Sequence, residues 1–92
     1  MSVRIRFFAR FRELADPEIV TEVREGTSIT ALIYAVTENN QAARDAIFDQ
    51  EGGFRRYVIL MQNGARIETT RAGETMVADG DEIAIFPPVA GG

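Results

Sequence analysis

Hydrophobic and polar residues alternate strictly at the start of the chain. The run V-R-I-R-F at residues 3–7 predicts a half-buried strand whose apolar side chains share one face, and the same alternation places Phe8 on the opposite face. A turn signal at Asp16-Pro17 precedes a second run, I-V-T-E-V-R at residues 19–24, which is rich in β-branched residues. The N-terminal quarter of the chain therefore predicts two adjacent strands.

The period then changes from two to about 3.6 residues, which is typical of an amphipathic helix. Thr27 or Ser28 supplies the N-cap oxygen of this main helix, and Asn39-Asn40 is a plausible end. A shorter helix is expected over residues 41–49, before the helix-breaking pair Gly52-Gly53. The apolar stripe of the main helix consists of Ile29, Leu32, Ile33 and Val36.

The second half of the chain again has the pattern of strands. A β-branched and aromatic run at residues 57–62 meets Asn63-Gly64, which predicts a type I′ hairpin turn and a returning strand over residues 65–68. A last strand is expected at Glu82–Phe86, with Ile83 and Ile85 facing inward. Proline follows at once and ends the strand.

This order of elements predicts an α+β fold, in which the main helix lies on one face of a mixed sheet to bury its apolar stripe. With the first and last strands side by side and parallel in the middle, the architecture is the β-grasp, or ubiquitin-like, fold. We expect four to five strands, one main helix and one short helix. Residues 1–86 form the β-grasp domain, and residues 87–92 form a flexible C-terminal Gly-Gly tail.

Two aromatic residues fall on the outward face of the predicted sheet. Phe8 and Phe86 lie opposite the core set of their strands, and either Leu60 or Met61 joins them, depending on the register. If the first and last strands are neighbours, these side chains form an apolar patch of the kind that marks an interface. The alternative is that the short helix or a loop covers this patch.

Composition excludes most catalytic chemistry. The chain has no Cys and no His, which excludes disulfides, structural zinc, thiol nucleophiles and imidazole catalysis. The acidic cluster Asp79, Asp81 and Glu82 has the composition of a tight turn and too few ligands for a calcium loop. We therefore expect a protein that is not an enzyme and binds no metal and no cofactor.

Charge and hydropathy limit the partners. The net charge of −4 argues against nucleic acid, and no stretch is apolar enough to span a membrane. All ten basic residues are arginine, so the chain offers no lysine amine for acylation. These features predict a cytoplasmic protein that is a monomer when free.

The chain ends in F-P-P-V-A-G-G. Pro87 and Pro88 hold the chain extended, and the pair Gly91-Gly92 can pass through a slot too narrow for any other residue. The alternative is a frayed end without a role. A carboxylate at Gly92 is unreactive until it is activated, most simply through adenylation with ATP by another enzyme's active site.

These residues resemble the ubiquitin-like sulfur carriers (MoaD-like and ThiS-like), and most closely the small subunit of molybdopterin synthase. The resemblance rests on FFARFREL at residues 7–14, GTSITALI at 26–33 and DGDEIAIFPPVAGG at 79–92. It implies that a ubiquitin-activating-like adenylating enzyme consumes ATP to activate Gly92, which becomes a thiocarboxylate. The thiocarboxylate then donates sulfur in molybdenum or tungsten cofactor biosynthesis.

The resemblance also implies partners and roles. The molybdopterin synthase large subunit would receive the tail, with Gly91 threading its slot, while Phe8, Phe86, Pro87, Pro88 and Val89 dock the partners. The segment at residues 41–57 is longer than in the leanest bacterial carriers, as in archaeal relatives that include small modifier proteins. The alternative is therefore a protein modifier joined through Gly92 to lysines of target proteins.

Overall fold

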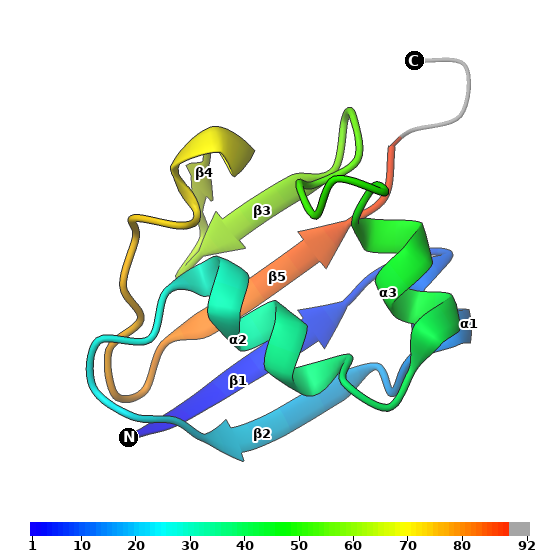
Figure 1. The fold of residues 1–92 in the computed structure, drawn as a ribbon. Coiled ribbons are helices and arrows are strands. Elements are labelled where there is room, and N and C mark those ends of the chain that lie inside the picture. The colour runs from blue at the N-terminus through cyan, green and yellow to red at the C-terminus, as the bar shows by residue number, and fades with distance from the viewer. Residues whose placement is uncertain (89–92) are drawn as a thin grey trace.

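The structure, a computed structural model, describes residues 1–88, so the tail positions Val89, Gly91 and Gly92 lie outside it. One mixed sheet has the strand order β2-β1-β5-β3-β4 (Figure 1). Its strands are β1 (Ser2–Phe7), β2 (Glu18–Glu22), β3 (Ile59–Gln62), β4 (Ala65–Ile67) and β5 (Glu82–Phe86). The second strand starts one residue earlier and ends two residues sooner than its sequence pattern predicts.

The two predicted helices are present as α2 (Ile29–Val36) and α3 (Gln41–Ile47). Both lie over the same face of the sheet (Figure 1). The structure adds a one-turn helix, α1 (Phe11–Leu14), and a 3₁₀ turn, η1 (Thr69–Arg71). No helix within residues 1–88 is long and apolar enough to cross a membrane.

The first and last strands are parallel neighbours at the centre of the sheet. Ile5 pairs with Ile83 and Phe7 with Ile85, while β2 and β3 flank this central pair in antiparallel orientation. The predicted β-grasp fold is therefore confirmed. The parallel pairing also sends the N-terminus and the end of β5 to opposite ends of the molecule (Figure 1).

The core lies between the sheet and α2. Ile29, Leu32 and Ile33 of α2 are fully buried, as predicted, whereas Val36 is only partly buried at the edge of the core. Burying each such side chain contributes about 1.5–3 kcal/mol to folding. The facing side chains of the sheet are Val3, Ile5, Phe7, Leu60, Ile83 and Ile85.

Local signals in the sequence position the helices and the hairpin. Ser28, rather than Thr27, caps α2, because its Oγ accepts a hydrogen bond from the Ala31 N–H at 3.0 Å. Asn40 caps α3 in the same way. Asn63 and Gly64 have φ of 51° and 85°, as a type I′ turn requires, which confirms the predicted hairpin.

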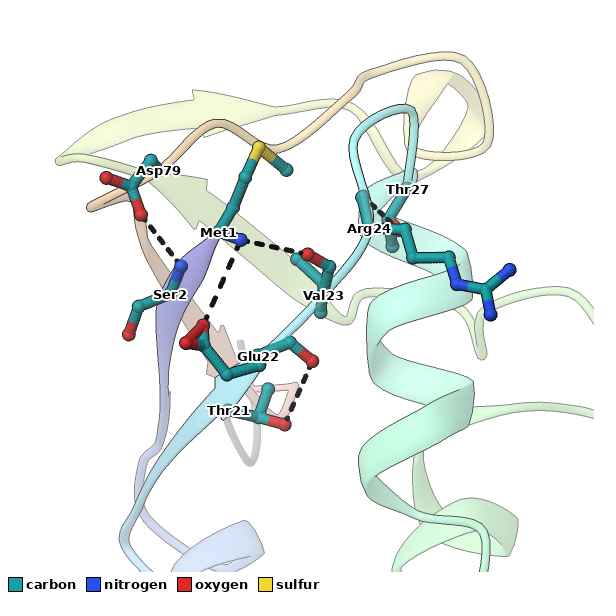
Figure 2. A network of polar contacts seen from close by, with 8 residues as sticks. All are labelled: Met1, Ser2, Thr21, Glu22, Val23, Arg24, Thr27 and Asp79. Atoms are coloured by element: carbon teal, nitrogen blue, oxygen red, sulfur yellow. Dashed lines mark hydrogen bonds and ion pairs between the residues drawn. The ribbon is translucent and has the colours of Figure 1, made fainter.

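The end of the sheet remote from the tail is tied together by hydrogen bonds (Figure 2). The Met1 amino group donates to the Val23 carbonyl at 3.1 Å and lies 3.9 Å from the Glu22 carboxylate. The Ser2 N–H donates to Asp79 Oδ1 at 2.7 Å. These contacts join β1 to β2 and to the loop before β5.

The longer segment after α2 is part of the folded domain. Ile47 and Phe48 are buried, and the Phe48 ring stacks on Tyr34 of α2 with centroids 4.1 Å apart. The Tyr34 hydroxyl donates to the Gly52 carbonyl at 2.8 Å. The loop between α3 and β3 is thereby held against the main helix.

Candidate functional site

The central parallel strands bring the two predicted aromatic residues together. Phe8 follows β1 directly, and its N–H donates to the Ile85 carbonyl at 3.1 Å, which places its ring beside Phe86. The two rings are stacked, with centroids 4.4 Å apart and planes 11° from parallel. Each ring is half-buried. The predicted pairing of Phe8 and Phe86 outside the helix-covered core is therefore confirmed.

The strand register decides between Leu60 and Met61. Leu60 is fully buried in the core, so Met61 points to the outward face, where it lies opposite Ala84. Ile59 lies opposite Phe86 and shares its face. We call this set the outer patch; it consists of Phe8, Ile59, Met61, Ala84 and Phe86.

Charged side chains border the outer patch. The Arg6 guanidinium lies 5.0 Å from the centre of the Phe8 ring and forms ion pairs with Glu82 at 3.5 Å and Glu18 at 3.9 Å. Because these groups are exposed, each pair contributes at most about 1 kcal/mol to stability. Their main effect is on recognition, since a partner surface must match an apolar centre with charges of both signs beside it.

An apolar cleft of about 760 Å³ opens beside the outer patch, at the end of the sheet where β5 ends. Its single charged lining residue is Arg10, and the short helix α3 contributes Ala46 to one wall. The helix thus borders the site, while Phe8 and Phe86 keep part of their surface exposed. The lining residues are Ala9, Arg10, Phe11, Ala46, Ile59, Phe86, Pro87 and Pro88.

A sharp turn after β1 shapes one wall of this cleft. Ala9 has a left-handed backbone with φ of 51°, and the Phe11 N–H donates to the Phe8 carbonyl at 3.1 Å to start α1. Phe11 is buried and anchors that helix in the core. Sequence reasoning missed α1 and the cleft-lining Arg10, because alanine does not signal a left-handed turn and one helical turn is too short to show a period.

The prolines lie where the chain leaves the sheet. Pairing between β3 and β5 ends at Ile59 and Phe86, because Pro87 and Pro88 have no N–H to continue it. Pro87 is half-buried against the cleft and Pro88 is exposed. The roles predicted for Val89, Gly91 and Gly92 fall outside the described residues and stay predictions.

The acidic turn has a structural use. Asp79 accepts the hydrogen bond from Ser2, and Asp81 accepts hydrogen bonds from Asn63, Gln62 and the Ala78 N–H. Within residues 1–88, no group of three or more acidic side chains is arranged to hold a metal ion. The site defined by the structure is thus an apolar surface and cleft beside Pro87 and Pro88.

A β-grasp domain with an aromatic surface beside a proline-led C-terminal segment defines the class of ubiquitin-like carriers and modifiers. Comparison with known families gives the same result, since the chain matches the ThiS family over residues 5–92. The chain belongs to the ThiS family. Members of this family are small carriers or modifiers without catalytic activity of their own.

Archaeal relatives resemble the chain over nearly its whole length. Small archaeal modifier protein 1 of Haloferax volcanii is 30% identical over 95% of this chain and 97% of its own length. Small archaeal modifier protein 3 of the same organism is 27% identical over the full length of both chains. The crystal structure of the first superimposes with a TM-score of 0.87 over the whole of both chains, at 26% identity.

A third similar protein carries a different kind of name. It comes from Pyrococcus furiosus and is provisionally assigned as subunit 1 of a molybdopterin converting factor. It is 28% identical, with a TM-score of 0.74, over 97% of this chain and 99% of its own. The relatives therefore support membership in the group of ubiquitin-like sulfur carriers and modifiers. Their names include both small archaeal modifier proteins and a molybdopterin converting factor.

Proposed function

We propose that this protein is a sulfur carrier whose Gly92 carboxylate is adenylated by a ubiquitin-activating-like enzyme and converted to a thiocarboxylate. In the adenylation step, the carboxylate attacks the α-phosphorus of ATP and pyrophosphate leaves. A sulfur donor of the persulfide class then displaces AMP, and reductive cleavage of the resulting acyl disulfide by a thiol leaves the thiocarboxylate. The thiocarboxylate donates its sulfur in molybdopterin synthesis, on the large subunit of the synthase.

The observation that carries this proposal is the position of the chain's exit from the sheet. Pro87 and Pro88 leave β5 beside the stacked pair Phe8 and Phe86, and both prolines line the apolar cleft. A partner that covers the outer patch would therefore be held next to the segment that leads to Gly92. The protein needs no catalytic side chain for this role, since the partners supply the chemistry.

The first test uses the full chain with the adenylating enzyme of its host, ATP and a sulfur source. We expect carrier-dependent exchange of pyrophosphate into ATP, and a mass increase that corresponds to replacement of one oxygen by sulfur. Deleting Gly91 and Gly92 should abolish both signals and leave the thermal melt unchanged, because the core ends at Ile85. An unmodified C-terminus after complete turnover of a control carrier would contradict the proposal.

A second candidate function, conjugation to lysines of other proteins, is favoured by the likeness to the two Haloferax volcanii modifiers. Both functions begin with the same adenylate, so they differ in the nucleophile that attacks it. Sulfur transfer to a pterin precursor by the large subunit would support the carrier. An isopeptide bond to a target lysine would support the modifier.

Detecting that isopeptide bond needs a modified tail. Arg71 is the last basic residue, so trypsin would leave all of residues 72–92 on a target lysine. The substitution Ala90→Arg would shorten this remnant to Gly-Gly, provided that the variant is still adenylated. Remnants that depend on Gly92 would establish conjugation, and their absence after enrichment would contradict it.

A further inference from the structure

Tyr57 occupies a strained position just before β3. The Val58 N–H donates to the Arg55 carbonyl at 3.2 Å and closes a four-residue turn in which Tyr57 is the third residue, with φ of 70°. That position of a turn favours glycine or asparagine, because a side chain with a Cβ is crowded when φ is positive. The chain places one of its two tyrosines there instead.

Packing within the domain does not account for this choice. The side chain is 69% exposed, which makes it the most exposed large hydrophobic residue of residues 1–88. Its recorded aromatic contact is with the Arg56 guanidinium, 5.8 Å from the ring centre. An exposed ring held in a strained backbone conformation, without burial to compensate, points to a role outside the folding of the monomer.

Tyr57 lies just before the end of β3 that pairs with the last residue of β5. Tyr57 comes two residues before Ile59, which lies opposite Phe86 in the last pair formed between β3 and β5. Figure 1 shows the loop that leads into β3 beside the chain leaving β5. Tyr57 is therefore two residues from Ile59, which belongs both to the outer patch and to the lining of the cleft.

The neighbouring charges indicate what kind of surface fits here. Arg56 is exposed and forms no ion pair with an acidic side chain of residues 1–88. Arg55 is engaged within the domain, because its Nε donates to the Asp45 carbonyl at 2.6 Å. An exposed tyrosine between the unpaired Arg56 and the apolar Ile59 matches a partner that presents apolar side chains next to a carboxylate.

We propose that Tyr57, together with Arg56, docks the enzyme that activates the tail, against an apolar and acidic surface of that enzyme. This inference rests on the proposed function, since it assumes a partner that holds the segment leading to Gly92. Tyr57 takes no part in bond making. It positions the carrier, so its loss should weaken binding of the carrier more than it slows the chemical step.

The test compares the variant Tyr57→Gly with wild type in carrier-dependent pyrophosphate exchange. Glycine relieves the backbone strain, so we expect a melting temperature equal to or above that of wild type. We expect KM for the carrier to rise about tenfold with kcat nearly unchanged, as for loss of an interfacial aromatic anchor. Tyr57→Phe keeps the ring and should retain most of the wild-type KM.

A matched control is Val20→Ala, which trims an exposed apolar residue, 59% exposed, on the far edge strand β2. Its KM should equal that of wild type. If Tyr57→Gly has a wild-type KM, or melts well below wild type, the inference on Tyr57 is wrong while the proposed function stands. If the enzyme fails to adenylate wild type itself, the proposed function fails, and the docking role fails with it.

Discussion

Asp81 is a buried carboxylate that joins three segments of the chain. It accepts hydrogen bonds from Asn63 Nδ2 at 2.8 Å, from Gln62 Nε2 at 3.0 Å and from the Ala78 N–H at 2.8 Å. Burial alone would raise the pKa of Asp81, but the hydrogen bonds from Asn63, Ala78 and Gln62 outweigh it and lower the pKa. The charged form is therefore the one that holds the β3–β4 hairpin to the start of β5.

This lowered pKa predicts a loss of stability in acid. A carboxyl group with a lower pKa in the folded state contributes stability above its unfolded pKa of about 4 and loses that contribution as the pH falls. Asp81→Asn replaces an acceptor with a donor, so we expect it to unfold about 1–3 kcal/mol more easily at pH 7. The difference between the two proteins in free energy of unfolding should be smaller at pH 3 than at pH 7.

Chemical denaturation of both proteins at pH 7 and pH 3 measures this effect. The control is Asp79→Asn, which alters an exposed carboxylate on the neighbouring turn that accepts a single hydrogen bond, from Ser2. If wild type and Asp81→Asn differ in free energy of unfolding by the same amount at pH 7 and at pH 3, the charge of Asp81 does not stabilise the fold.

At the scale of elements, β2 is an open edge of the sheet. The Val23 N–H donates to the Met1 carbonyl, and the Phe7 N–H donates to the Pro17 carbonyl. Because the pairing alternates along an antiparallel strand, the backbone groups of Glu18, Val20 and Glu22 point away from β1. An exposed strand edge is a template for pairing with a second copy. If two copies paired antiparallel through these edges, centred on Val20, Glu18 of each copy would lie directly opposite Glu22 of the other.

Like charges directly opposite each other destabilise a strand pair, so the two glutamates keep the edge free. We predict that wild type is monomeric and that the double variant Glu18→Val/Glu22→Val self-associates. Sedimentation velocity over a range of concentrations measures this change. As a control, Glu13→Val/Glu25→Val removes the same charge outside the strand and should remain monomeric; dimerisation of both variants would rule out edge pairing.

At the scale of the whole molecule, the parallel β1 and β5 collect residues from both ends of the chain at one surface. Phe8 and Phe86 are far apart in sequence, yet their rings stack beside the prolines that lead to the tail. The opposite end of the sheet is closed by the contacts of Met1 and Ser2 (Figure 2). The molecule thus has one end suited to docking and one that is tied by hydrogen bonds.

We predict that Phe86→Asp weakens binding to the adenylating enzyme and to the large subunit by at least tenfold, because it places an unpaired charge in the apolar contact. The domain should still fold, since the ring is only half-buried and outside the core cluster. Titration calorimetry and thermal melts test both parts. Val20→Asp, on the remote edge strand, is the control, and loss of folding by Phe86→Asp would show that the ring is structural.

Much of the fold could be predicted from local signals. The alternation at residues 3–7 and the helical stripe at Ile29 and Leu32 each require one face to be buried, whatever the rest of the chain does. The dipeptide Asn63-Gly64 specifies its turn through its own backbone preferences. The strand, the helix and the turn each depend on residues that are close in sequence, so the local sequence pattern is enough to identify them.

The sequence by itself also determined that no thiol or imidazole is available and that Phe8 and Phe86 face outward, because residue identity settles the first and a period of two the second. Only the tertiary structure decided the rest of the site: Met61 rather than Leu60, the cleft beside Arg10, and the left-handed turn at Tyr57. These features depend on strand register and on left-handed turns at residues that do not favour them. Such features arise from contacts between distant segments, which no local pattern records.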